Sequence, residues 1–286
     1  MNIIFQINGG LGKSVMATSV CKSIKIKYPD SKLIVVTAYP DVFLNNPNVD
    51  RCLKYGEIKY FYKEYVKDKD FLFLGQEPYQ TDEYIHNKTH LVETWCKLYD
   101  LPFIQHQGEM FLTKREIDFY SRKYQFNKPI LVLQTSGGGS DLMYNWGRDI
   151  PPVFAKRIIQ EYHQQFDIVH IKNENQITYD NVIPFTDNIR AVSVILGMSQ
   201  KRILIDSSVQ HISAALGLTS NVFWITTSPS VFGYQDNNNV LSNPETKEVT
   251  LANSFLTKYE LVPNISDFPY NDESEIFNQE SLKTLI

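Results

Sequence analysis

Short apolar runs alternate with longer segments of helical periodicity over the first two thirds of the chain. The predicted strands cover residues 3–7, 33–37, 71–74, 110–112, 130–134, 167–171, 202–205 and 222–225. The spacing of apolar residues predicts helices from residue 14 to the break at Pro29, over 83–99, from 114, over 152–165, 189–198 and 208–216. Strands that alternate with helices are typical of a parallel α/β sheet.

The opening pattern of the chain occurs twice. The strand at 3–7 leads into a glycine cluster, and the strand at 130–134 leads into Ser136-Gly137-Gly138-Gly139-Ser140. Two Rossmann-like domains in tandem explain this better than one long sheet. We predict an N-terminal domain over 1–126, a second domain over 127–240, and a loop-rich tail over 241–286. The tail is expected to pack back on the N-terminal domain and to end in a short helix near Glu280.

The bulk composition excludes several classes of protein. The 286 residues are 43% hydrophobic and carry a net charge of -4, so no global basic field favours nonspecific nucleic-acid binding. The three dispersed cysteines form no CxxC pair, which argues against a zinc site and fits a reducing cytoplasm. No stretch approaches the roughly 20 apolar residues of a membrane span. Abundant Asn, Lys, Ile, Tyr and Phe hint at an AT-rich phage or bacterial genome, and for a phage protein we expect the host cytoplasm.

The first candidate phosphate loop is Asn8-Gly9-Gly10-Leu11-Gly12-Lys13-Ser14. Glycines let the backbone approach phosphates, and the helix N-terminus that follows favours anions. The end of the segment fits the P-loop G-x-x-x-x-G-K-[ST], but Ile7 stands at the first glycine. The segment resembles the deviant P-loop of ParA/MinD-type ATPases incompletely, because Asn8 replaces their lysine, and it resembles the GGLG turn of GT-B glycosyltransferases. A tight turn without a ligand is the alternative. The contacts expected here come from Gly10, Gly12 and Ser14.

The second candidate segment runs from Asp206 to Gly217. Ser207 and Ser208 stand where a helix begins, with hydroxyls and free amides available to phosphate oxygens, and His211 lies one turn further. A capped amphipathic helix with a structural histidine is the alternative. The segment resembles the D-S/T-G-x-x-H-x-A-A-A-L-G signature of the GT-9, heptosyltransferase-like glycosyltransferases, with Ser208 where the family has glycine. The resemblance extends over most of residues 1–230.

This resemblance implies a GT-B fold, in which two Rossmann-like domains face each other across a cleft. It implies a metal-independent glycosyltransferase without a cofactor, which moves a sugar from a nucleotide-sugar to an acceptor: a glycan precursor or, in a phage, a modified DNA base. It places the donor diphosphate and sugar on Asp206, Ser207, Ser208 and His211. The further donor candidates are the loop residues Ser136, Gly137 and Gly138, the cation Arg148, and Glu174 for the ribose hydroxyls. A flexible turn, a surface arginine and a solvated carboxylate are their respective alternatives.

Two departures from the family pattern affect the expected chemistry. The family often has an aspartate, proposed as general base, where this chain has Lys13. A lysine is a poor base at its usual pKa, but it could contact the donor phosphate or the leaving group. The catalytic candidates are therefore Lys13, His211 and, as an N-domain carboxylate, Asp41, with His86 and Glu109 as further candidates for the base. The family also has a lysine before the tryptophan that Trp146 matches; here it is Asn145, and Arg148 could replace it.

Two other hypotheses stay open at this point. A ParA/MinD-like ATPase would use Lys13 and Mg²⁺, and a non-catalytic relative would bind the nucleotide-sugar without transferring it. A separate stretch interleaves aromatic residues with lysines at Lys59, Tyr60, Phe61, Tyr62, Lys63, Tyr65 and Lys67. Such rings could stack on an acceptor base or sugar. We favour an amphipathic helix face.

Overall fold

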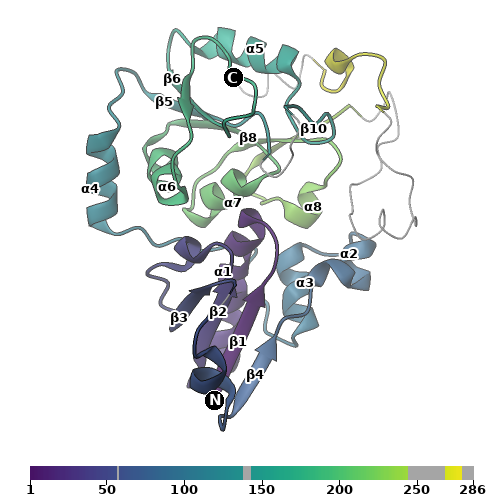
Figure 1. Cartoon of the computed structure of the whole chain (residues 1–286). Helices are drawn as coiled ribbons and strands as arrows, with labels where there is room; N and C mark the ends of the chain where they lie inside the picture. The colour runs from purple at the N-terminus through teal and green to yellow at the C-terminus, as the bar shows by residue number, and fades with distance from the viewer. Residues whose placement is uncertain (57, 138–142, 244–267, 279–286) are drawn as a thin grey trace.

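The computed structural model describes residues 1–56, 58–137, 143–243 and 268–278, and these form two parallel sheets one after the other (Figure 1). The first sheet has the order β3-β2-β1-β4, with β1 (Asn2–Ile7), β2 (Lys32–Thr37), β3 (Arg51–Lys54) and β4 (Phe71–Leu74). The second has the order β10-β9-β8-β5-β6-β7, with β5 (Ile130–Leu133), β6 (Asp167–Ile171), β7 (Ile183–Phe185), β8 (Lys201–Ile205), β9 (Asn221–Trp224) and β10 (Asn238–Leu241). The predicted α/β class is confirmed.

Helices cover these sheets and join them. The first half contains α1 (Leu11–Lys27), η1 (Pro40–Phe43), η2 (Tyr62–Val66), η3 (Pro78–Gln80), α2 (Asp82–Ile85) and α3 (Leu91–Leu98), and α4 (Lys114–Lys123) follows in the connection. The second half contains α5 (Pro152–Tyr162), α6 (Ile189–Met198), α7 (Ser208–Ala215), α8 (Pro229–Phe232) and η4 (Glu273–Glu275). In Figure 1, α1 and α7 lie between the two sheets, and they pack against each other.

The central strand β1 shows why the first half folds this way. Its side chains alternate between two apolar clusters, so both faces of the strand are buried, as expected for a parallel sheet. One face packs on α1 and on Trp95 of α3, whose ring lies 5.3 Å from that of Phe5. The other face is covered by Tyr65 of η2. The turn after β1 requires glycine, since Gly9 has a φ of 101°.

The second sheet is buried in the same way. α5 covers one face through Phe154, while α6 and α7 cover the other. Of the tail that was expected to pack on the N-terminal domain, residues 268–278 instead pack here, because Phe277 contacts the rings of Phe154 and Phe223 at centroid distances of 5.7 and 4.9 Å. The helix expected near Glu280 lies outside the described residues.

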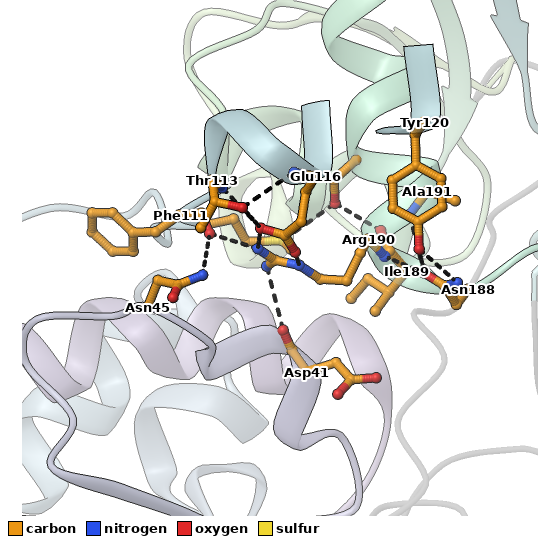
Figure 2. Close-up of polar contacts among 12 residues, drawn as sticks. Asp41, Asn45, Phe111, Thr113, Glu116, Tyr120, Asn188, Ile189, Arg190 and Ala191 are labelled. Carbon is orange, nitrogen blue, oxygen red and sulfur yellow. Dashed lines mark hydrogen bonds and ion pairs between the residues drawn. The ribbon is translucent and has the colours of Figure 1, made fainter. Parts of the chain in front are cut away.

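Arg190 on α6 ties the two halves together (Figure 2). Its guanidinium bonds Glu116 on α4 in bidentate fashion at 2.7 and 3.1 Å, and also the carbonyl of Phe111 at 2.6 Å. It reaches the carbonyl of Asp41 in η1 at 3.4 Å. The guanidinium holds the pKa of Glu116 down at about 2, so this carboxylate stays ionised. One side chain therefore anchors the segment that connects the two domains to both of them.

Two sequence predictions need correction. Residues 110–112 form no strand, because this segment crosses between the domains and its carbonyl groups face side chains such as Arg190. The single helix predicted over 83–99 is two helices, α2 and α3. Asn87 between them has a φ of 51°, which ends α2, and His90 then caps α3 by accepting a hydrogen bond from the Val92 amide.

Candidate functional site

A cleft of about 1220 Å³ lies between the two halves, at the carboxyl ends of the central strands. The first half lines it through the loop after β1 and through Tyr39, Tyr79 and Tyr84. The second half lines it through the residues after β5, β6, β7, β8 and β9. Ligands of open α/β sheets bind at this edge, where the helix N-termini also point.

Two helix N-termini without side-chain caps face the cleft from opposite domains. Helix α1 starts after Gly10 and α7 after Ser207, and neither capping residue makes a side-chain hydrogen bond to its helix. Neither first turn contains an acidic residue. Their first amides therefore lack intrahelical acceptors, and the helix dipoles add partial positive charge. Gly10, Gly12, Ser207 and Ser208, which the sequence analysis proposed for phosphate binding, all line the cleft.

His211 on α7 rests against Gly12 on α1. A Cβ at Gly12 would lie 2.7 Å from Cδ2 of His211, so only glycine allows the ring to rest there. The other side of the ring is fixed by the Tyr234 hydroxyl, 2.8 Å from Nδ1. Burial lowers the pKa of His211 to about 4, so the ring is neutral near pH 7. When Tyr234 donates to Nδ1, Nε2 carries the proton and is a donor beside Gly12.

Arg148 and Asp206 place opposite charges at the N-terminus of α7. Asp206 follows β8, is buried, and accepts a hydrogen bond from Gln210 at 3.0 Å. The Arg148 guanidinium lies 3.8 Å from its other oxygen and remains 43% exposed toward the cleft. This exposure leaves most of the Arg148 donors available to an anion.

Loop residues after β5 are anchored by a carboxylate that the sequence analysis missed. Asp149 accepts hydrogen bonds from the amides of Gly137 at 3.0 Å and Asn145 at 2.9 Å. Gln176 donates to the Gly137 carbonyl at 2.6 Å. Both polar groups of Gly137 are thus occupied within the protein, whereas Ser136 lines the cleft. Gly138 lies outside the described residues.

The predicted ribose ligand Glu174 is exposed and is absent from the described cleft lining. Its neighbours Lys172 and Asn173 do line the cleft. So does Asp187 after β7, which Lys123 and the Tyr124 hydroxyl hold ionised, with its pKa lowered to about 2. Asp187 is therefore the carboxylate at this end of the cleft.

Lys13 lines the cleft, but its ammonium group points into the first domain. It pairs with Glu77, which follows β4, and lies 4.9 Å and 5.2 Å from the ring centroids of Tyr79 and Trp95. Only 3% of the side chain is exposed. Burial lowers the pKa of Lys13, although the Glu77 carboxylate opposes the shift. The sequence analysis missed Glu77, which follows the edge strand β4.

The remaining N-domain candidates lie away from the cleft. The Asp41 carboxylate is exposed and turns away from Arg190 in Figure 2. The Ser14 hydroxyl is buried and bonds Thr37 at 3.1 Å. His86 pairs with Asp82 on α2, and Glu109 pairs with Lys22 at 2.8 Å. None of the four appears among the residues that line the described cleft.

The aromatic and lysine stretch is also outside the described cleft lining. It forms the helical turn η2, with Tyr65 buried against the sheet and Tyr60 and Tyr62 exposed to 76% and 66%. This arrangement supports the amphipathic interpretation that the sequence favoured. Within the described ranges, no group of three or more His, Cys, Asp or Glu side chains is placed to hold a metal ion. No helix in those same ranges is long and apolar enough to span a membrane.

Comparisons with known proteins establish the fold. No protein-family model matches the sequence, and no curated protein matches it. Among solved structures, the family 9 glycosyl transferase of Veillonella parvula matches with a TM-score of 0.65 at 12% identity, over 99% of this chain and 95% of its own. The E. coli ADP-heptose LPS heptosyltransferase II matches with a TM-score of 0.68 at 12% identity, over 100% and 98%.

The E. coli heptosyltransferase WaaC, solved with ADP, also matches, with a TM-score of 0.57 at 12% identity over 91% of this chain and 99% of its own. The chain thus has the two-domain GT-B fold of the GT-9 heptosyltransferases, as the sequence predicted. The competing ParA/MinD-like hypothesis predicts neither the second sheet nor the cleft between two domains.

Proposed function

We propose that this chain is a metal-independent glycosyltransferase that moves a sugar from a nucleoside-diphosphate sugar to an acceptor hydroxyl. One observation carries this proposal: the N-termini of α1 and α7, neither of which has a side-chain cap, and the partly exposed Arg148 all face the same cleft. A diphosphate placed there meets free amides from both domains and a guanidinium. Each N-terminus stabilises an anion by about 0.3–1 kcal/mol at an exposed site, and more where the site is partly buried.

The same groups account for catalysis of the transfer. The diphosphate gains negative charge as its bond to the sugar breaks, and fixed donors aimed at that charge lower the barrier. Asp206 and neutral His211 lie beside the α7 N-terminus, where they can orient the sugar and a diphosphate oxygen. We assign the nucleotide to the second domain, with its ribose near Asp187 in place of Glu174.

Adenine nucleotides are the first donors to test, because the structurally similar heptosyltransferase WaaC was solved with ADP. The test is a thermal-shift screen of ADP, GDP, UDP, CDP and dTDP in EDTA, followed by an assay of nucleotide release from the matching nucleotide-sugars. We expect at least one diphosphate to raise Tm without metal and its sugar derivative to be turned over. No shift with any of them would overturn the proposal.

A ligand-binding relative without catalysis is the second candidate, because Lys13 replaces the aspartate that the GT-9 resemblance associates with the base. It predicts a thermal shift with a nucleoside diphosphate but no nucleotide release above the buffer rate. The same two assays therefore separate the two candidates.

A further inference from the structure

Tyr234 is a buried side chain that supports a residue of the cleft without lining the cleft itself. It stands two residues after α8, and its hydroxyl lies 2.8 Å from Nδ1 of His211 on α7. Its ring packs edge-on against that of His211 and also contacts the ring of His90, both at centroid distances of 5.8 Å. Its carbonyl accepts a hydrogen bond from the Asn237 amide at 3.2 Å. The hydroxyl is thus held in place beneath the His211 ring.

The hydrogen-bond partners of the Tyr234 hydroxyl determine where the imidazole carries its proton. Only 3% of Tyr234 is exposed, and burial raises the pKa of its phenol, so the hydroxyl keeps its proton. Among the described residues, Nδ1 of His211 is the only acceptor for that proton. A buried hydroxyl that donates to nothing is costly, so Tyr234 donates and Nδ1 accepts. The neutral His211 ring therefore carries its own proton on Nε2.

The Nε2 atom of His211 is free to meet a ligand. It has no hydrogen-bond partner among the described residues, and it is not one of their enclosed unpartnered nitrogens, so it opens on the cleft that His211 lines. A Cβ at Gly12 would lie 3.3 Å from Nε2 and 3.4 Å from Cα of Ser208. The Nε2 proton is therefore presented beside the first residues of both α1 and α7.

We propose that Tyr234 is a positioning residue of the transfer site: its hydroxyl holds the His211 ring so that the Nε2 proton faces the diphosphate between the N-termini of α1 and α7. The inference rests on the proposed function. With the proton on Nδ1 instead, Nε2 would turn a lone pair toward an anion. With the proton on Nε2, the ring adds a third donor to the two sets of helix amides, and this donor strengthens its bond as the diphosphate gains charge.

The first test needs no ligand. Long-range ¹H–¹⁵N spectra of protein labelled on histidine nitrogens identify the protonated nitrogen of each ring, and the signals lost in His211→Ala assign His211. Near neutral pH we expect wild type to carry the His211 proton on Nε2 and an unprotonated Nδ1. In Tyr234→Phe the Nδ1 resonance should shift, because it loses its hydrogen-bond donor. A wild-type ring with its proton on Nδ1 would overturn the proposal.

The second test measures whether Tyr234 acts through His211. The Kd of the nucleoside diphosphate that gives the largest shift among ADP, GDP, UDP, CDP and dTDP is determined by calorimetry in EDTA for wild type, Tyr234→Phe, His211→Ala and the double variant. The loss of one hydrogen bond predicts about 3–10-fold weaker binding in Tyr234→Phe. In the His211→Ala background the same substitution should change Kd by less than about twofold.

Tyr99→Phe is the matched control. It also removes a hydroxyl with one hydrogen bond, 2.7 Å from the Gln76 carbonyl, but Tyr99 lies outside the described cleft lining. Its Kd should stay within about twofold of wild type.

Unchanged diphosphate binding in Tyr234→Phe would overturn the role of Tyr234 and leave the proposed function intact. An equal loss of affinity with and without the His211 ring would also overturn it, because Tyr234 would then act through the fold alone. A wild type that binds none of the diphosphates overturns the proposed function, whereas the nitrogen spectra still decide which nitrogen of His211 carries the proton.

Discussion

The contact between Gly12 and His211 gives a quantitative test of how the two domains meet. In Gly12→Ala the new methyl would lie 2.7 Å from Cδ2 and 3.3 Å from Nε2 of His211, and 3.4 Å from Cα of Ser208. The ring cannot swing away freely, because it is buried and bonded to Tyr234. Overpacking of this kind costs about 1–3 kcal/mol.

Part of that cost is offset by helix propensity. Gly12 lies in the first turn of α1, where alanine gains up to about 1 kcal/mol over glycine. The net expectation is a loss of about 1–2 kcal/mol, which lowers Tm by roughly 2–6 °C for a chain of this size. Gly197→Ala on α6 is the matched control: a Cβ there meets nothing within 4 Å, so the same substitution should leave stability unchanged or raise it.

A double-mutant cycle in urea isolates the contact. His211→Ala removes the ring, so Gly12→Ala should cost little in that background, and the two substitutions should show a coupling energy of about 1–2 kcal/mol. Additive effects within about 0.5 kcal/mol would refute the contact as the reason for glycine at this position.

Three further predictions concern stability and binding. Arg190→Met leaves Glu116 without its cation and should cost about 3 kcal/mol in urea unfolding; a loss below about 1 kcal/mol would show that Arg190 does not hold the domains together. The buried His90, His170 and His211 have their pKa values lowered to about 3, 4 and 4, so the unfolded chain binds more protons below its own histidine pKa of about 6.5. The free energy of unfolding is therefore unaffected by these histidines above that pH. It falls as the pH drops toward 4, by about 1.4 kcal/mol per histidine per pH unit. Equal free energies of unfolding at pH 7 and pH 5 would contradict this prediction. Arg148→Ala removes a charge-assisted contact worth about 1.5–3 kcal/mol and should weaken nucleoside-diphosphate binding roughly 10–100-fold by calorimetry; an unchanged Kd would place the diphosphate elsewhere.

Sheet position accounts for the strands that the sequence analysis missed, although the edge strand β4 was predicted from its apolar run Phe71–Leu74. Continuous apolar runs predicted the strands that are buried on both faces, such as β1, β2, β5 and β8. The three strands that were not predicted, β3, β7 and β10, all lie at sheet edges. An edge strand is half exposed and tolerates polar residues or proline, as Arg51–Lys54 and Pro184 show.

The residues of the candidate site also fall into a group that the sequence predicted and a group that it did not. The glycine loop and the segment Asp206–His211 were predictable, because each is local and sits at the end of a strand. Glu77 and Arg190 were not assigned, because their partners are distant in the chain: Lys13 and Glu77 are 64 residues apart, and Arg190 and Glu116 are 74. No spacing rule connects such pairs before the topology is known.

The central claim is that the cleft between the two domains binds a nucleoside diphosphate through its diphosphate group. The most direct measurement is a calorimetric titration of wild-type protein, in EDTA, with the best diphosphate of the screen and with its parent nucleoside. We predict one site per chain for the diphosphate and at least a hundredfold weaker binding of the nucleoside, because two helix N-termini and Arg148 then lack their ligand. Equal affinity for the two, or no binding of the diphosphate, would contradict the account.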